Sequence, residues 1–140
     1  MKKMNKKGFT LIEMLAVIAI IAVLVAIIVP AVGSSTTKAK ASTDAANLRS
    51  VLSAATIEYA ETGSLDALAI DAPASKLDSG YTSIVVGLNG DAMEAYFSNG
   101  TNYISIDALT AVADGSDTDG VNTVAATSVT LTGSKTLTAG

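Results

Sequence analysis

One carboxylate interrupts a long apolar run near the start of the sequence. From Phe9 to Val29, Glu13 is the only ionisable side chain. An ionised group in an apolar environment is costly unless a cation or a proton neutralises it. We therefore treat Glu13 as a functional candidate whose chemistry is charge pairing. The alternative is a glutamate tolerated near a membrane interface.

The rest of the sequence offers little for catalysis. The 140 residues include no cysteine and no histidine, which excludes thiol catalysis, Ser-His triads and ordinary zinc sites. Nothing in the spacing of the acids singles out a carboxylate pair for hydrolysis. We expect no enzyme activity, no catalytic residue and no cofactor.

Charge is divided unequally along the chain. Nine basic residues oppose thirteen acidic ones, and four of the nine precede Phe9, namely Lys2, Lys3, Lys6 and Lys7. A chain starting at Phe9 therefore carries five basic against thirteen acidic side chains. An acidic body gives no support for nucleic-acid binding through a basic face, and we predict none.

A short acidic loop is the one candidate for a metal site. Asp114, Asp117 and Asp119 alternate with small residues, and calcium favours carboxylates offered by flexible turns. The spacing and the final glutamate of an EF-hand are absent. We interpret the loop as a solvated turn between strands and keep the three aspartates as a weak calcium candidate.

The apolar run is long enough to cross a bilayer. Phe9–Val29 spans roughly 31 Å as a helix. The lysines precede it, which predicts that they stay cytoplasmic and that the C-terminal body crosses. A cleavable secretory signal would be shorter and would end at a small-x-small site. The nearest such site, Ala31-Val32-Gly33, lies beyond Pro30, and a simple anchor does not explain Glu13.

The segment Lys6-Lys7-Gly8-Phe9-Thr10-Leu11-Ile12-Glu13 resembles the processing signature of type IV prepilins and pseudopilins. The resemblance implies that residues 1–8 are a leader and that a prepilin peptidase cuts between Gly8 and Phe9. It implies that the same enzyme then N-methylates Phe9. It also implies that Glu13 neutralises the Phe9 amine of a neighbouring subunit in the filament core.

The same resemblance implies partners and a location. The partners are other copies of the chain in a helical homopolymer, the peptidase and methyltransferase, and the assembly platform with its ATPase. The precursor would be a single-pass protein of the cytoplasmic membrane, and the mature subunit would join an extracellular pilus. Gram-negative pilins usually carry a C-terminal disulfide loop, so the lack of cysteine favours a Gram-positive lineage.

Pro30 and Gly33 mark a change within the predicted helix. A proline inside a helix removes one hydrogen bond and clashes with the preceding turn. We predict that the helix continues with a kink or local melting at these residues, the alternative being a plain helix end. We place the transmembrane and assembly half of the helix at 9–33 and an exterior-facing pilin domain at 34–140.

Residues 34–62 are predicted to form an amphipathic helix that ends at Thr62-Gly63-Ser64. Its apolar stripe, at spacings of three and four, consists of Ala41, Ala45, Leu48, Leu52, Ala55 and Tyr59. The alanines permit close approach of a sheet, and a coiled-coil seam is the alternative.

Strand signals dominate after a connecting loop at 63–80. Tyr81–Leu88, Met93–Ser98 and Thr101–Ile106 are expected as strands, and Asn99-Gly100 predicts a hairpin between the last two. These runs predict an α+β fold in which the long N-terminal helix packs against an antiparallel sheet over 81–140, the pilin fold.

Two further predictions concern the C-terminal end of the sheet. Val121–Leu131 alternates apolar residues with threonine and serine, which predicts a strand. Gly133-Ser134 then suits a type II′ hairpin that returns through Leu137.

Together these features indicate a structural subunit of a type IV pilus that serves adhesion, surface motility or aggregation. A pseudopilin of a type II secretion or DNA-uptake system shares the N-terminal half and is the alternative. A membrane-tethered enzyme or binding module is the third hypothesis. The lack of histidine and cysteine and of a phosphate-cradling loop opposes it.

Overall fold

A computed structural model describes residues 8–117 and 121–139. The chain divides into two compact units, Met1–Ser35 and Thr36–Gly140. Residues 1–7 of the predicted leader 1–8 and Asp119, one of the weak calcium candidates, lie outside the described residues.

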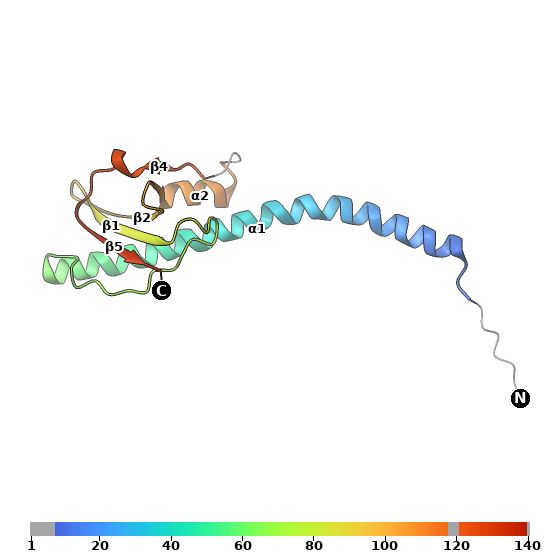
Figure 1. Ribbon diagram of the computed structural model, residues 1–140, viewed down its shortest axis with the longest axis horizontal. Coiled ribbons are helices and arrows are strands. Elements are labelled where there is room, and N and C mark those ends of the chain that lie inside the picture. Colours follow the sequence, from blue (N-terminus) through green and yellow to red (C-terminus); the bar gives the residue numbers. More distant parts are fainter. Residues whose placement is uncertain (1–7, 118–120, 140) are drawn as a thin grey trace, which may run out of the picture. The chain divides into compact units, whose positions relative to one another are not determined.

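Helix α1 runs without a break from Leu11 to Thr62 and contains Pro30 (Figure 1). The helix therefore continues beyond the proline, as predicted. Just after Pro30, the hydroxyls of Ser34 and Ser35 both donate to the Ala31 carbonyl at 3.1 Å. Such side-chain bonds to the preceding turn often bend helices, and the kink itself stays a prediction.

The end of α1 is the predicted one. Gly63 follows the helix with a φ of 70°, in the left-handed region that favours glycine. Its N–H donates to the Tyr59 carbonyl at 2.8 Å, which satisfies one of the last free carbonyls of the helix.

The C-terminal part forms a five-stranded antiparallel sheet in the order β4-β3-β2-β1-β5, so the α+β fold class is confirmed (Figure 1). The strands are β1 (Ser83–Asn89), β2 (Ala92–Ser98), β3 (Asn102–Ser105), β4 (Val124–Ala125) and β5 (Thr132–Thr138). The predicted hairpin after β2 is present, with Gly100 at a φ of 87°.

One face of the α1 segment after Thr36 packs into the core of the sheet. The buried α1 side chains are Ala41, Asp44, Ala45, Leu48, Val51 and Ala55, and the sheet contributes Ile84, Val86, Ala95, Phe97, Ile104 and Leu137. The predicted stripe is partly wrong. Leu52 is only partly buried, Tyr59 is 36% exposed, and Val51 faces the core instead. Positions 51 and 52 lie three and four residues after Leu48, so helical periodicity alone allows either of them to face the core.

A second helix, α2 (Ile106–Asp114), occupies a segment for which no helix was expected. The Ser105 side chain caps its start by accepting from the Ala108 N–H at 3.2 Å, and Gly115 ends it with a φ of 85°. Leu109 and Val112, three positions apart, bury one face. A serine cap, an apolar pair at helical spacing and a closing glycine were the available signals.

Two β predictions are corrected. The segment Val121–Leu131 is not one strand: only Val124–Ala125 pairs in the sheet, followed by a 3-10 turn at Ala126–Ser128. Most of its side chains are exposed, so its alternation has no buried face to fix a strand.

Gly133-Ser134 is not a hairpin either, because both residues lie within β5. Gly133, with a φ of 60°, sits where the β1–β5 register shifts between Val86 and Leu88. A positive φ serves a β-bulge as well as a hairpin. On β1, a Cβ at Gly87 would lie 3.0 Å from the Ser134 Cβ, so the two strands meet closely there.

We expect a chain that begins at Ser34 to be soluble and to show mixed helix and sheet by circular dichroism. In that chain, Leu48→Ala should lower the free energy of unfolding by about 2–5 kcal/mol, because Leu48 is fully buried. Leu52→Ala, at a partly buried position of the same helix, is the control and should cost less. Equal losses measured by urea denaturation would contradict this packing.

Candidate functional site

The first turn of α1 places Glu13 in a reciprocal pair with Thr10. The Thr10 N–H donates to Glu13 Oε2 at 2.8 Å, and the Glu13 N–H donates to the Thr10 hydroxyl at 3.3 Å. This is a capping box, in which a threonine and a glutamate three positions later satisfy each other's free N–H groups. Sequence reasoning overlooked it, although the Thr-x-x-Glu spacing was visible.

Glu13 therefore has a local partner before any second subunit is considered. The carboxylate is exposed to solvent, and an ionised carboxylate has lone pairs for several donors. Its bond to Thr10 leaves it able to accept from an additional amine.

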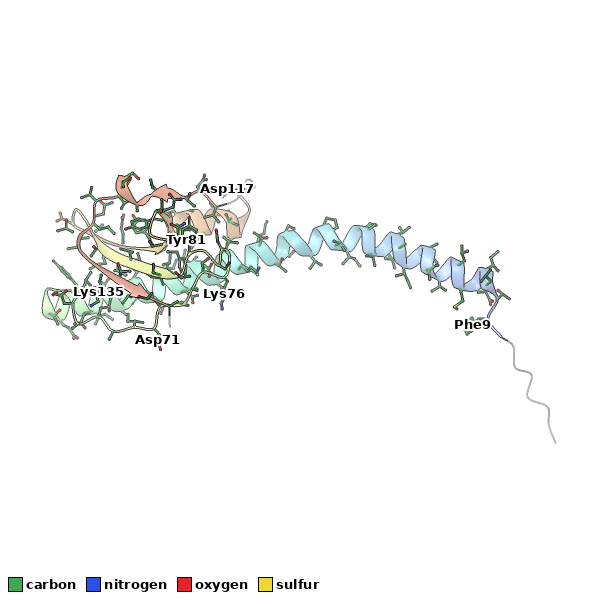
Figure 2. The ribbon with its side chains drawn as sticks, viewed as in Figure 1. Phe9, Asp71, Lys76, Tyr81, Asp117 and Lys135 are labelled. Carbon is green, nitrogen blue, oxygen red and sulfur yellow. The ribbon has the colours of Figure 1, made fainter. Side chains whose placement is uncertain are left out.

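The peptide bond between Gly8 and Phe9 lies outside the helix. Both residues are non-helical and exposed, and the Phe9 side chain is 82% exposed beside the start of α1 (Figure 2). A Cβ added at Gly8 would meet nothing within 4 Å. The fold of this chain therefore does not require glycine at position 8, and any requirement comes from a partner.

The N-terminal half of α1 presents apolar side chains on all sides. From Leu11 to Val29 every side chain is exposed. Among the described residues, α1 is the one helix long and apolar enough to cross a membrane. A helix that is apolar all round suits a membrane or a protein interior.

A comparison with protein-family models matches residues 3–29 to the prokaryotic N-terminal methylation motif. The chain carries the type IV prepilin signature. This signature is common to pilus subunits and pseudopilins, and with the apolar helix it fits a membrane-anchored precursor. Comparisons with curated proteins and with solved structures found no match.

The part of the chain after Ser35, called the body below, contains a buried carboxylate that sequence reasoning missed. Asp44, on α1, is fully buried. It accepts from the Ser75 hydroxyl at 2.6 Å and from the N–H groups of Lys76 and Leu77 at 2.8 and 2.9 Å. In Figure 2 the label at Lys76 marks the position of this loop. The available signal was an aspartate inside the apolar stripe, between Ala41 and Ala45.

Ser75 extends the network around this carboxylate. Its hydroxyl accepts from the N–H groups of Leu77 and Asp78 at 3.2 and 3.1 Å, and its own N–H donates to the Tyr81 carbonyl at 3.0 Å. Asp44 thus holds the connecting loop to the helix in a chain that has no disulfide to do so.

Asp44→Asn in the chain beginning at Ser34 should lower the free energy of unfolding by about 3 kcal/mol. An amide replaces a charged acceptor of several hydrogen bonds and turns one oxygen into a donor that faces donors. The control is Asp71→Asn, an exposed position of the same connecting loop, which should change stability little. Similar losses for both variants would contradict the buried network.

The predicted metal loop is engaged in local hydrogen bonds. Asp114 Oδ1 accepts from the Ser116 N–H at 2.8 Å, and bonds from Ser116 lower the pKa of Asp114, which keeps it ionised. Asp117 Oδ2 accepts from the Asn122 amide at 2.7 Å. Within residues 8–117 and 121–139, no group of three or more acidic side chains could hold a metal ion.

Calcium should therefore change the melting temperature of the body only slightly. An ion that binds only the folded state stabilises it by an amount that grows with the logarithm of the free ion concentration above its Kd. Thermal unfolding with calcium and with a chelator measures the difference. A shift of several degrees that Asp117→Ala and Asp119→Ala abolish would contradict the interpretation as a turn.

Tyr96 and Glu94 on β2 form a hydrogen-bonded pair with a structural role. The Tyr96 hydroxyl donates to the Glu94 carboxylate, which also accepts from the Asn89 amide at 3.0 Å. Burial, and then the hydrogen bond to Glu94, raise the pKa of Tyr96 above its ordinary value. The phenol therefore stays protonated at neutral pH and acts as a donor rather than as a base.

Proposed function

We propose that this chain is a structural subunit of a type IV pilus, processed between Gly8 and Phe9 and polymerised through the N-terminal half of α1. The observation that carries the proposal is the match of residues 3–29 to the N-terminal methylation motif. The exposed apolar surface of the helix supports it, because a mature subunit would need other helices to cover that surface outside the membrane.

Cleavage creates the charge that Glu13 would meet. Hydrolysis of the Gly8–Phe9 bond leaves a positive amine on Phe9 and removes the four lysines of the leader. In a filament core from which water is excluded, an unpaired amine or carboxylate costs several kcal/mol. Pairing the amine of one subunit with Glu13 of a neighbour neutralises both groups and fixes the axial register.

Mass spectrometry of the surface protein tests the processing. The mature chain should begin at Phe9 and be heavier by one methyl group. Replacing Gly8 with a bulky residue should leave an uncut precursor in the membrane, although the chain itself has room for a side chain there. A mature chain that begins after Gly33 would establish an ordinary signal peptide instead.

The capping box makes Glu13→Gln the most informative variant for assembly. A glutamine oxygen still accepts from the Thr10 N–H, so the cap is retained while the charge is lost. We expect insertion and cleavage to survive and filaments to be lost or greatly reduced. Electron microscopy of sheared filaments, beside an immunoblot of the membrane-held subunit, measures both.

Two further variants bracket this result. Glu13→Ala removes the charge together with the Glu13 half of the capping box and should also lose filaments, whereas Glu13→Asp keeps the charge with a shorter reach and should be intermediate. Normal filaments from Glu13→Gln at normal subunit levels would mean that capping, rather than charge pairing, is the role of Glu13.

A further inference from the structure

The start of α1 has an identifiable chemical cause. Thr10 lies just before the helix, and its carbonyl accepts from the N–H groups of Glu13 and Met14 at 3.1 and 3.3 Å. Its hydroxyl accepts from the Glu13 N–H, and its own N–H donates to the Glu13 carboxylate. Thr10 is thus the N-cap residue, with Glu13 completing the box.

We propose that Thr10 is a positioning residue for the cleavage of the Gly8–Phe9 bond, because it stops α1 just after that bond. This inference rests on the proposed function. In the reaction, water adds to the Gly8 carbonyl carbon and the bond to the Phe9 nitrogen breaks. Gly8 leaves as a carboxylate and Phe9 keeps the amine.

A peptide bond inside a helix is a poor substrate, because its carbonyl and N–H are held in the helical ladder. Cleavage takes place in backbone that is open or that opens locally. The described backbone at Gly8 and Phe9 is already open, and its side chains are exposed. A peptidase therefore does not have to unwind a helix to reach this bond while the cap is in place.

Without the Thr10 hydroxyl, the Glu13 N–H keeps only its 3.1 Å bond to the Thr10 carbonyl among the described residues. The first N–H groups of a helix beside a membrane must be satisfied within the chain or by water. Extending the helix through Phe9 and Gly8 toward the aqueous side provides carbonyl partners. Gly8 opposes this only weakly, since glycine disfavours a helix by about 1 kcal/mol.

Substitutions at Thr10 distinguish the effect of its capping hydroxyl from the effect of its side-chain shape. Serine and asparagine cap as well as threonine or better, whereas valine has the shape of threonine without a hydroxyl. Thr10→Val should therefore lower kcat/KM for cleavage by up to about fivefold, because the loss of one cap shifts the ratio of open to helical backbone by about that factor. Thr10→Ser and Thr10→Asn should be cut at close to the wild-type rate.

The test uses the full-length precursor in membranes with a prepilin peptidase, and cleavage is followed by mass spectrometry. If the peptidase instead recognises the shape of the side chain, Thr10→Val will be cut normally and Thr10→Asn slowly, which overturns the inference. Equal rates for all variants overturn it too. A wild-type chain that is not cut between Gly8 and Phe9 contradicts the proposed function itself.

A second measurement checks the mechanism directly. Carbonyl chemical shifts of the precursor in micelles should show non-helical Gly8 and Phe9 in the wild type and in Thr10→Ser, and shifts that move toward helical values in Thr10→Val. Slow cleavage of Thr10→Val with both residues still non-helical would overturn the positioning role.

Discussion

The hydrogen bonds between Glu13 and Thr10 set two properties of the start of α1. They fix where an apolar helix of membrane length begins, and they hold a carboxylate at that boundary. In the uncut chain the carboxylate accepts a hydrogen bond from the Thr10 N–H, which replaces part of its solvation but leaves its charge. In the proposed function, cleavage would then supply an amine next to the same hydrogen bonds. One four-residue motif would in that case serve folding, processing and assembly.

In the body, a sheet and a long loop are held on a helix without a disulfide. Alanines at 41, 45 and 55 and Leu48 are buried on α1 and belong to the same apolar core as the sheet residues. Asp44 sits among these apolar residues because the loop around Ser75 brings it three donors. A buried carboxylate is tolerated where donors surround it, and its removal leaves them unpaired.

The sequence predicted those features that depend on local chemistry and long periodicity. The long helix, its end at Gly63 and the β2–β3 hairpin follow from apolar runs and from glycines at turns. Features that depend on a partner elsewhere in the chain were missed or misread. Gly133 permits a positive φ, but whether that makes a hairpin or a bulge depends on β1. Val121–Leu131 alternates like a strand, yet its side chains find no face to bury. From the sequence alone Asp44 is interpreted as a solvated charge, because its hydrogen-bond partner Ser75 is distant in the sequence. The capping box and α2 had local signals that could have been used.

The position of the Phe9 amine in the assembled filament tests the proposed charge pairing most directly. Electron cryo-microscopy of filaments sheared from cells, at a resolution that shows side chains, would locate it directly. We predict density for the Phe9 amine of one subunit within hydrogen-bonding distance of the Glu13 carboxylate of a neighbour, with Thr10 still capping its own helix. A Phe9 amine that contacts no neighbouring carboxylate, with Glu13 bonded only to Thr10 of its own chain, would contradict this charge pairing.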